Sequence, residues 1–231
     1  MKVNFTFDYL SLGLTTNDYL LEMGYRKCKP QSKVMDMIHY YEQELTDRVK
    51  ALCTFTISKG ILSESKIILD NAPSLHVGNI LGHLLEGSVH FAIFAATAGL
   101  EFQSYYDEMK RQDDMLSLFI LDTMGSCIVE KAGDLMEQHL GEIISPHQHT
   151  ARFSPGYCGW TLNEQQNIFH ILGRHPCNIA LADSFLMYPL KSISGVIGIG
   201  DQVNERKYGC DICNLKTCYK RKNKKKYDTY K

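Results

Sequence analysis

The segment from Arg152 to Tyr157 combines residue types that can bind a flat, charged ligand. Pro155 and Gly156 form a turn signal, because proline presets φ and glycine accepts a positive φ without strain. The missing side chain at Gly156 also lets a ligand approach the backbone closely. Arg152 offers a planar fork of donors that suits a carboxylate, and Tyr157 offers an aromatic face. The combination suits a ligand that carries an amino acid; the alternative is an ordinary turn.

A helix is expected directly after this turn. Thr161 and Glu164 have the spacing of a capping box, which predicts that a helix starts just after Trp160. The turn at Gly156 and Tyr157 then lies immediately before a helix N-terminus, where free N–H groups favour anions such as a carboxylate.

Three cysteines near the end of the chain have the spacing of metal ligands. Cys210, Cys213 and Cys218 form a C-x2-C-x4-C pattern, and their thiolates can meet at one Zn²⁺ ion or one iron–sulfur cluster. Three reduced surface thiols are the alternative. The histidine and further cysteine of a nucleic-acid-binding zinc knuckle are missing, so no nucleic-acid partner is expected.

Composition indicates a single globular protein rather than a membrane or polyanion-binding one. The 231 residues are 44% hydrophobic and 22% charged, with a formal net charge of −1. The first seven residues lack the pattern of a secretory signal, and no apolar run reaches the ~20 residues that span a bilayer. We expect a cytoplasmic protein with one domain over residues 1–205, followed by a cysteine-rich knuckle and basic tail over 206–231. The scattered Cys28, Cys53, Cys127 and Cys177 are expected to be buried thiols.

Hydrophobic periodicity predicts an alternation of strands and helices. The strands are expected at Lys2–Phe7, Ala51–Ser58, Val89–Ala95 and Lys191–Ile199. Helices are expected at Thr16–Met23, Leu75–Leu85, Leu100–Met109 and Asp113–His139. A further helix is expected to begin after a cap at Ser32. The helix at Asp113–His139 is the longest, and Asp122, Ser126 and Glu130 are spaced four residues apart on one of its faces. A solvated face is the default interpretation of these polar residues.

The order of motifs in the second half of the chain resembles one family. The Arg-x-x-Pro-Gly-Tyr turn is followed by a helix, by Asp-Ser-Phe-x-Met-x-Pro at 183–189, and by Ser-x-Ser-Gly at 192–195. This order resembles the activation (reactivation) domain of cobalamin-dependent methionine synthase, which binds S-adenosylmethionine. The likeness extends from about Tyr25 to Gly200 and is strongest after Arg152. It implies an α+β fold with a twisted, mostly antiparallel sheet flanked by helices.

The resemblance also implies roles for residues of the turn. Arg152 would hold the methionine carboxylate, the backbone at Ser154 and Gly156 would meet the adenosine part, and Tyr157 would flank the ligand. Cys158, beside the turn, would be the fourth metal ligand, because a thiol here and the C-terminal knuckle occur together in free-standing members.

A carboxylate from the long helix is expected near the amino-acid end of the ligand. Ser126 stands where the family has that acid, with Asp122 one turn before it and Glu130 one turn after it. Both carboxylates therefore remain candidates.

The implied function is the reductive remethylation of a corrinoid stranded as cob(II)alamin on a separate protein. That partner would be a methionine synthase lacking its own activation domain or another corrinoid methyltransferase, with a flavodoxin-like or ferredoxin-like electron donor. Methyl transfer from a sulfonium to reduced cobalt needs no proton abstraction, so an accessory methyl-transfer enzyme can lack an acid–base constellation. The alternatives are a metal-stabilised, non-catalytic docking protein and an iron–sulfur electron carrier to a corrinoid protein.

Overall fold

The computed structural model describes residues 1–26 and 28–203, which contain a seven-stranded sheet. The strand order is β4-β3-β2-β5-β9-β6, with β1 also paired to β2, and every pairing is antiparallel. The strands are β1 Lys2–Asp8, β2 Lys50–Ser63, β3 Lys66–Leu69, β4 Leu75–His76, β5 His90–Thr97, β6 Gln148–His149 and β9 Ser192–Gly200. A small hairpin of β7 (Ala180–Leu181) and β8 (Met187–Tyr188) lies apart from this sheet.

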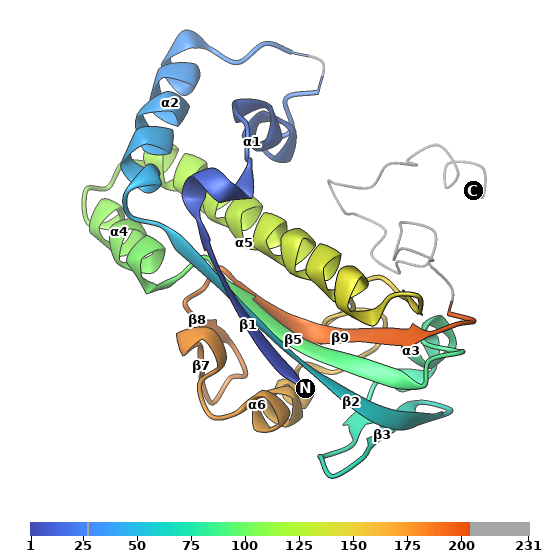
Figure 1. Ribbon diagram of the computed structural model, residues 1–231. Coiled ribbons are helices and arrows are strands. Elements are labelled where there is room, and N and C mark those ends of the chain that lie inside the picture. The colour runs from blue at the N-terminus through green and yellow to red at the C-terminus, as the bar shows by residue number, and fades with distance from the viewer. Residues whose placement is uncertain (27, 204–231) are drawn as a thin grey trace, which may run out of the picture.

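Helices cover both faces of the sheet (Figure 1). The long helix α5 crosses one face together with α1, α2 and α4, whereas α3, α6 and the β7–β8 hairpin lie on the other. The helices are α1 Thr16–Glu22, α2 Ser32–Thr46, α3 Gly78–Leu84, α4 Leu100–Lys110, α5 Met115–Ile144 and α6 Gln165–Leu172, with 3₁₀ turns at Tyr9–Leu12, Leu162–Glu164 and Pro176–Asn178. None of the helices within these residues is long and apolar enough to cross a membrane.

Strand β5 is apolar throughout because both of its faces are buried. Ala92, Phe94 and Ala96 pack into the core under α5. Phe91 and Ile93 pack into the core under α3 and α6. Because side chains alternate along a strand, β5 separates the two cores and forms the centre of the fold.

Helix α5 begins at Met115, close to the predicted start at Asp113, and Asp114 caps it. The carboxylate of Asp114 accepts hydrogen bonds from the backbone N–H groups of Leu116 (3.0 Å) and Ser117 (3.3 Å). A hydrogen bond from the Ser117 hydroxyl, together with these two backbone bonds, holds the pKa of Asp114 below its usual value. The helix continues to Ile144, five residues beyond the predicted end at His139.

The predicted α+β fold with an antiparallel sheet between helices is confirmed. Three local predictions are wrong. Residues 75–76 form a strand before α3 begins at Gly78, and Ser32 is the first residue of α2 rather than its cap. The capping box at Thr161 does not form, because the Glu164 carboxylate accepts the His76 N–H at 3.0 Å instead.

The scattered cysteines are less uniformly buried than predicted. Cys28 is exposed, Cys127 and Cys177 are half-buried, and Cys53 alone among the described cysteines is buried. Cys53 donates a hydrogen bond to the carbonyl oxygen of Ala132. Burial raises the pKa of the Cys53 thiol well above its usual value and that of Cys177 to about 12.

Alkylation of the native protein at pH 8 should separate these thiols. Because the thiolate is the reactive form, Cys53 and Cys177 are expected to react with iodoacetamide at least ~10-fold more slowly than Cys28. Peptide mass spectrometry measures the three rates, and the difference should vanish in denaturant. Equal rates for Cys177 and Cys28 in the native protein would contradict the raised pKa of the Cys177 thiol.

Candidate functional site

The segment that carries Arg152 is held against strand β9. The N–H of Phe153 donates to the carbonyl of Val196 at 3.0 Å, and the N–H of Val196 donates back to Phe153 at 2.9 Å. A side chain at Gly195 would overlap the carbonyl oxygen of Phe153. The bare Cα at Gly195 therefore lets the segment approach β9 closely enough to place Arg152 and Ser154 at one site.

The Pro-Gly turn is anchored by a buried tryptophan. Gly156, at a φ of +94°, donates its N–H to the carbonyl of Trp160 at 2.7 Å, and Trp160 donates to the carbonyl of Tyr157 at 2.8 Å. Trp160 is 1% exposed and packs into the core under α6. Tyr157 remains 60% exposed at the tip of the turn. This arrangement gives a rigid turn with an accessible aromatic ring.

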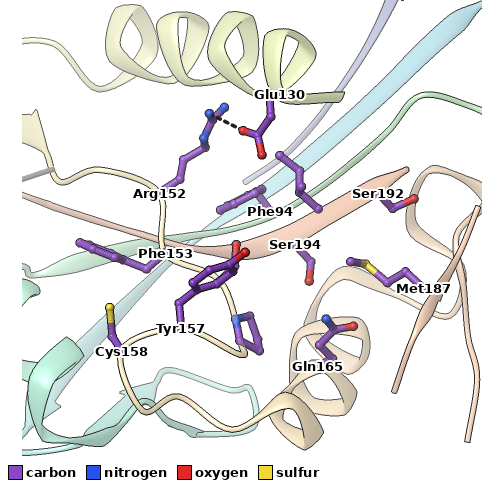
Figure 2. A pocket seen from close by; sticks show the side chains of 13 residues that line it. Phe94, Glu130, Arg152, Phe153, Tyr157, Cys158, Gln165, Met187, Ser192 and Ser194 are labelled. Atoms are coloured by element: carbon purple, nitrogen blue, oxygen red, sulfur yellow. Dashed lines mark hydrogen bonds and ion pairs between the residues drawn. The ribbon is translucent and has the colours of Figure 1, made fainter. Parts of the chain in front are cut away.

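A cavity of about 350 Å³ lies between this turn, α5, β9 and the start of α6 (Figure 2). Its wall combines apolar and polar side chains. The lining residues are Phe94, Glu130, Arg152, Phe153, Ser154, Pro155, Tyr157, Cys158, Gln165, Met187, Ser192, Ile193 and Ser194. The structure brings Arg152, Ser154, Tyr157, Cys158 and Glu130 together at this cavity, whereas Gly156 shapes the turn without lining it.

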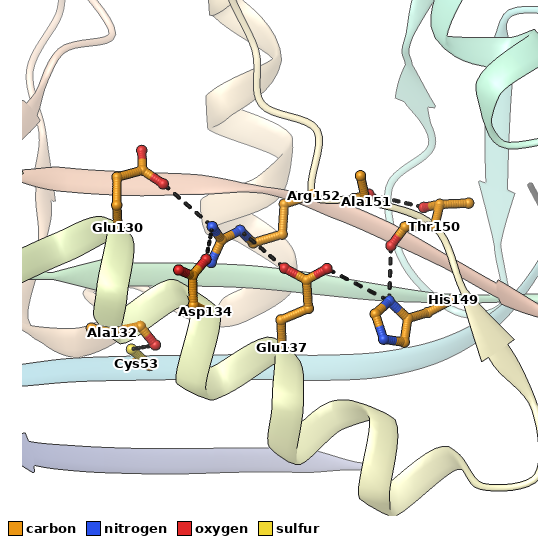
Figure 3. A network of polar contacts seen from close by, with 9 residues as sticks. All are labelled: Cys53, Glu130, Ala132, Asp134, Glu137, His149, Thr150, Ala151 and Arg152. Carbon is orange, nitrogen blue, oxygen red and sulfur yellow. Dashed lines mark hydrogen bonds and ion pairs between the residues drawn. The ribbon is translucent and has the colours of Figure 1, made fainter. Parts of the chain in front are cut away.

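The guanidinium of Arg152 is surrounded by three carboxylates of α5 (Figure 3). Its Nη2 lies 2.7 Å from Asp134 and 3.3 Å from Glu130, and its Nε lies 3.4 Å from Glu137. His149 lies 3.7 Å from Glu137 on the side away from Arg152. The side chain of Arg152 is 15% exposed, so these contacts fix its position between α5 and β9.

The three carboxylates differ in their access to the cavity. Glu130 lines it, whereas Asp134 and Glu137 do not. Glu137 is only 25% exposed, compared with 61% for Glu130. Glu130 can therefore exchange its contact with Arg152 for one with a ligand while the other two carboxylates keep the arginine in place.

Asp122, the other candidate carboxylate, lies outside this cavity. It is paired with Lys191 at 2.8 Å, and the same ammonium group donates to the hydroxyl of Ser126 at 2.9 Å. Lys191 lines a neighbouring cavity of about 430 Å³ that shares Glu130 with the first. The geometry therefore favours Glu130 over Asp122 as the ligand-facing acid.

Several polar atoms around the cavity lack partners among the described residues. Nη1 of Arg152, Oε1 of Gln165 and Oγ of Ser194 are buried and make no hydrogen bond. An unsatisfied buried polar group costs about 1–3 kcal/mol. A ligand in the cavity can complete the hydrogen bonding of Gln165 and Ser194, which line it, whereas Nη1 of Arg152 rests against Gly133 of α5.

Sequence reasoning missed several residues of this site. Asp134 and Glu137 follow Glu130 at helical spacing and could have been found by extending that face of the helix. Gln165 and Ser194 carry no comparable signal, because they reach the cavity from elements that only the fold brings together.

The predicted metal site falls largely outside the described residues. Cys210, Cys213 and Cys218 lie beyond residue 203, whereas Cys158 lines the cavity. Within residues 1–26 and 28–203, no group of three or more His, Cys, Asp or Glu side chains is arranged to hold a metal ion.

Two glycines of α5 allow a test of how Arg152 is positioned. A methyl group at Gly133 would overlap Nη1 of Arg152 and come within 2.9 Å of Ile193, whereas one at Gly141 would meet only the ring of His149, at 3.5 Å. Both substitutions gain the same helix propensity. Because the atoms in its way are the ends of the Arg152 and Ile193 side chains, which can shift, Gly133→Ala is expected to be less stable than Gly141→Ala by only about 1 kcal/mol in denaturant unfolding. A Gly133→Ala variant more stable than Gly141→Ala would contradict a guanidinium that rests on α5.

The chain resembles known proteins both in sequence and in fold. The model of the family described as "Vitamin B12 dependent methionine synthase, activation domain" matches residues 83–223. A solved structure, "Crystal Structure of the MetH Reactivation Domain bound to AdoHcy", has a TM-score of 0.67 and 13% sequence identity, over 90% of this chain and 80% of that chain. No curated protein matches the sequence.

Proposed function

The chain belongs to the family of vitamin B12-dependent methionine synthase activation domains, and on that premise we propose that it binds S-adenosylmethionine in the cavity beside Arg152. The observation that carries the proposal is the cavity itself. An arginine and a glutamate face each other at one end, and unpartnered buried polar atoms lie at the other. The MetH reactivation domain of the same fold is described as bound to AdoHcy, the demethylated form of this ligand.

The amino-acid end of the ligand matches the charged end of the cavity. Its carboxylate would accept from the guanidinium of Arg152, and its ammonium would donate to Glu130, which lies 3.3 Å from Arg152 before any exchange. Asp134 and Glu137 would keep the guanidinium in place during this exchange. A zwitterionic ligand would thus replace the Arg152–Glu130 ion pair by two ion pairs, one from Arg152 to its carboxylate and one from its ammonium to Glu130. No buried charge would be left unpaired.

The remaining residues of the turn would contact the nucleoside. Ser154, Pro155 and Tyr157 line the cavity. The exposed ring of Tyr157 would flank the ligand, and the turn at Gly156 would present its backbone to the adenosine part.

The charge of the site suits a methyl donor. Three carboxylates surround one guanidinium, which leaves a local excess of negative charge that favours the cationic sulfonium over its neutral thioether product. In the transfer, the S–CH₃ bond breaks as a bond from the methyl carbon to reduced cobalt forms, and no proton moves. The chain would therefore contribute binding and orientation rather than acid–base catalysis.

The acceptor would be a corrinoid held by a separate protein. We propose a methionine synthase without its own activation domain, or another corrinoid methyltransferase, as that partner. One electron from a flavodoxin-like or ferredoxin-like protein would first reduce cob(II)alamin to the nucleophilic cob(I) state. The metal site formed by Cys158, Cys210, Cys213 and Cys218 stays a prediction.

Titration calorimetry with S-adenosylmethionine tests the binding proposal. Arg152→Ala is expected to abolish saturable binding, and Glu130→Gln to weaken it by ~10–100-fold, because each removes a charge-assisted hydrogen bond. Asp122→Asn is the matched control on the same helix, and its affinity should stay within about twofold of the wild type. An effect of Asp122→Asn equal to that of Glu130→Gln would contradict the assignment of the acid.

The role in remethylation is tested with a corrinoid protein in its cob(II)alamin state. Addition of the wild-type chain, S-adenosylmethionine and a chemical reductant should produce the absorbance of methylcobalamin, and Arg152→Ala should not. If the chain binds S-adenosylmethionine tightly but forms no methylcobalamin with a methionine synthase or with another corrinoid methyltransferase, the remethylation role is refuted. The proposed binding of S-adenosylmethionine would still stand.

A further inference from the structure

Two buried polar side chains face each other across the end of the cavity away from Arg152. Gln165, the first residue of α6, is 5% exposed, and Ser194 on β9 is 1% exposed. Figure 2 shows the amide of Gln165 and the hydroxyl of Ser194 pointing toward one another, with Met187 beside them. Neither Oε1 of Gln165 nor Oγ of Ser194 has a hydrogen-bond partner within the described part of the chain.

Packing alone does not explain a glutamine at this position. The next inward-facing residues of α6, Ile168 and Phe169, are apolar and join the core under the sheet. An apolar residue at position 165 would avoid the cost of an unsatisfied amide, about 1–3 kcal/mol. The polarity of Gln165 is therefore better explained by a ligand than by the fold.

The walls between the two ends of the cavity suit a flat ring. Phe94, Pro155, Tyr157 and Met187 supply apolar or aromatic surface along the lining. Arg152 and Glu130 lie at one end, and Gln165 lies at the other (Figure 2). If the amino-acid end of the ligand meets Arg152, its heterocycle meets Gln165.

A carboxamide matches one edge of adenine in particular. It presents one acceptor and one donor side by side, whichever way the amide is turned. Adenine presents an exocyclic N–H donor beside a ring-nitrogen acceptor, and glutamine pairs with this edge through two hydrogen bonds. The hydroxyl of Ser194 can donate or accept and so can bond to the same edge or to the adjacent amide.

We propose that Gln165, supported by Ser194, binds the amine-bearing edge of the adenine ring and makes the site selective for adenine nucleosides. This inference rests on the proposed binding of S-adenosylmethionine and adds a specificity-determining residue to it. It predicts that the amine of the ligand and the amide of Gln165 are energetically coupled.

A double-mutant cycle measures this coupling. The two ligands are S-adenosylhomocysteine and its analogue with unsubstituted purine in place of adenine, which lacks only the amine. The wild type is expected to bind S-adenosylhomocysteine about 10-fold more tightly, since one hydrogen bond is lost with the analogue. Gln165→Leu should bind both ligands equally. Gln166→Leu, at the exposed next position of α6, should keep the wild-type preference.

The outcomes separate this inference from the proposed function. If S-adenosylhomocysteine binds and both Gln165→Leu and the more conservative Gln165→Met keep the full preference for the amine, the role of Gln165 is refuted while ligand binding stands. If the wild type binds neither nucleoside, both proposals fall. Circular dichroism of each variant establishes that its fold is intact.

Discussion

The ion pairs between Arg152 and helix α5 connect the parts of the fold that form the site. Arg152 belongs to a segment bonded to β9, and its three partners are on the helix that covers that face of the sheet. A guanidinium that is 15% exposed needs such partners, because an isolated buried charge is strongly unfavourable. The same pairs define one end of the cavity.

Two glycines allow this arrangement. Gly195 lets the backbone of Phe153 approach β9, and Gly133 lets the guanidinium rest against α5. A larger residue at Gly195 would push the backbone of Phe153 away from the sheet, whereas one at Gly133 would displace the ends of the Arg152 and Ile193 side chains. The closeness of helix, strand and segment is therefore a condition for the site, and the antiparallel sheet with β5 at its centre provides the rigid support.

Much of the fold could be predicted from the sequence, because long elements have clear periodicity. Strand β5 and helix α5 were expected close to their observed positions, and the order of motifs after Arg152 indicated the correct family. Short strands such as β4 and β6, of two residues each, are too short to show a period. The failed capping box has a tertiary cause, since Glu164 bonds to His76, which lies 88 residues earlier in the chain.

The site was predictable where its residues share one segment or one helix face. The turn at Pro155 and Gly156 came from a local pattern and the candidate Glu130 from the family resemblance, whereas the choice between Glu130 and Asp122 required the position of Lys191. Gln165 and Ser194 meet only because α6 and β9 border the same cavity. No local spacing encodes such a pair, so its chemistry emerges only from the folded chain.

The central claim is that a guanidinium held by an acidic helix face binds the amino-acid end of a methyl-donor nucleoside. A crystal structure with S-adenosylhomocysteine tests it most directly. The account predicts the ligand carboxylate within hydrogen-bonding distance of Arg152 and the Glu130 carboxylate turned to the ligand ammonium. A ligand bound elsewhere, with Arg152 still paired to Glu130, would contradict it.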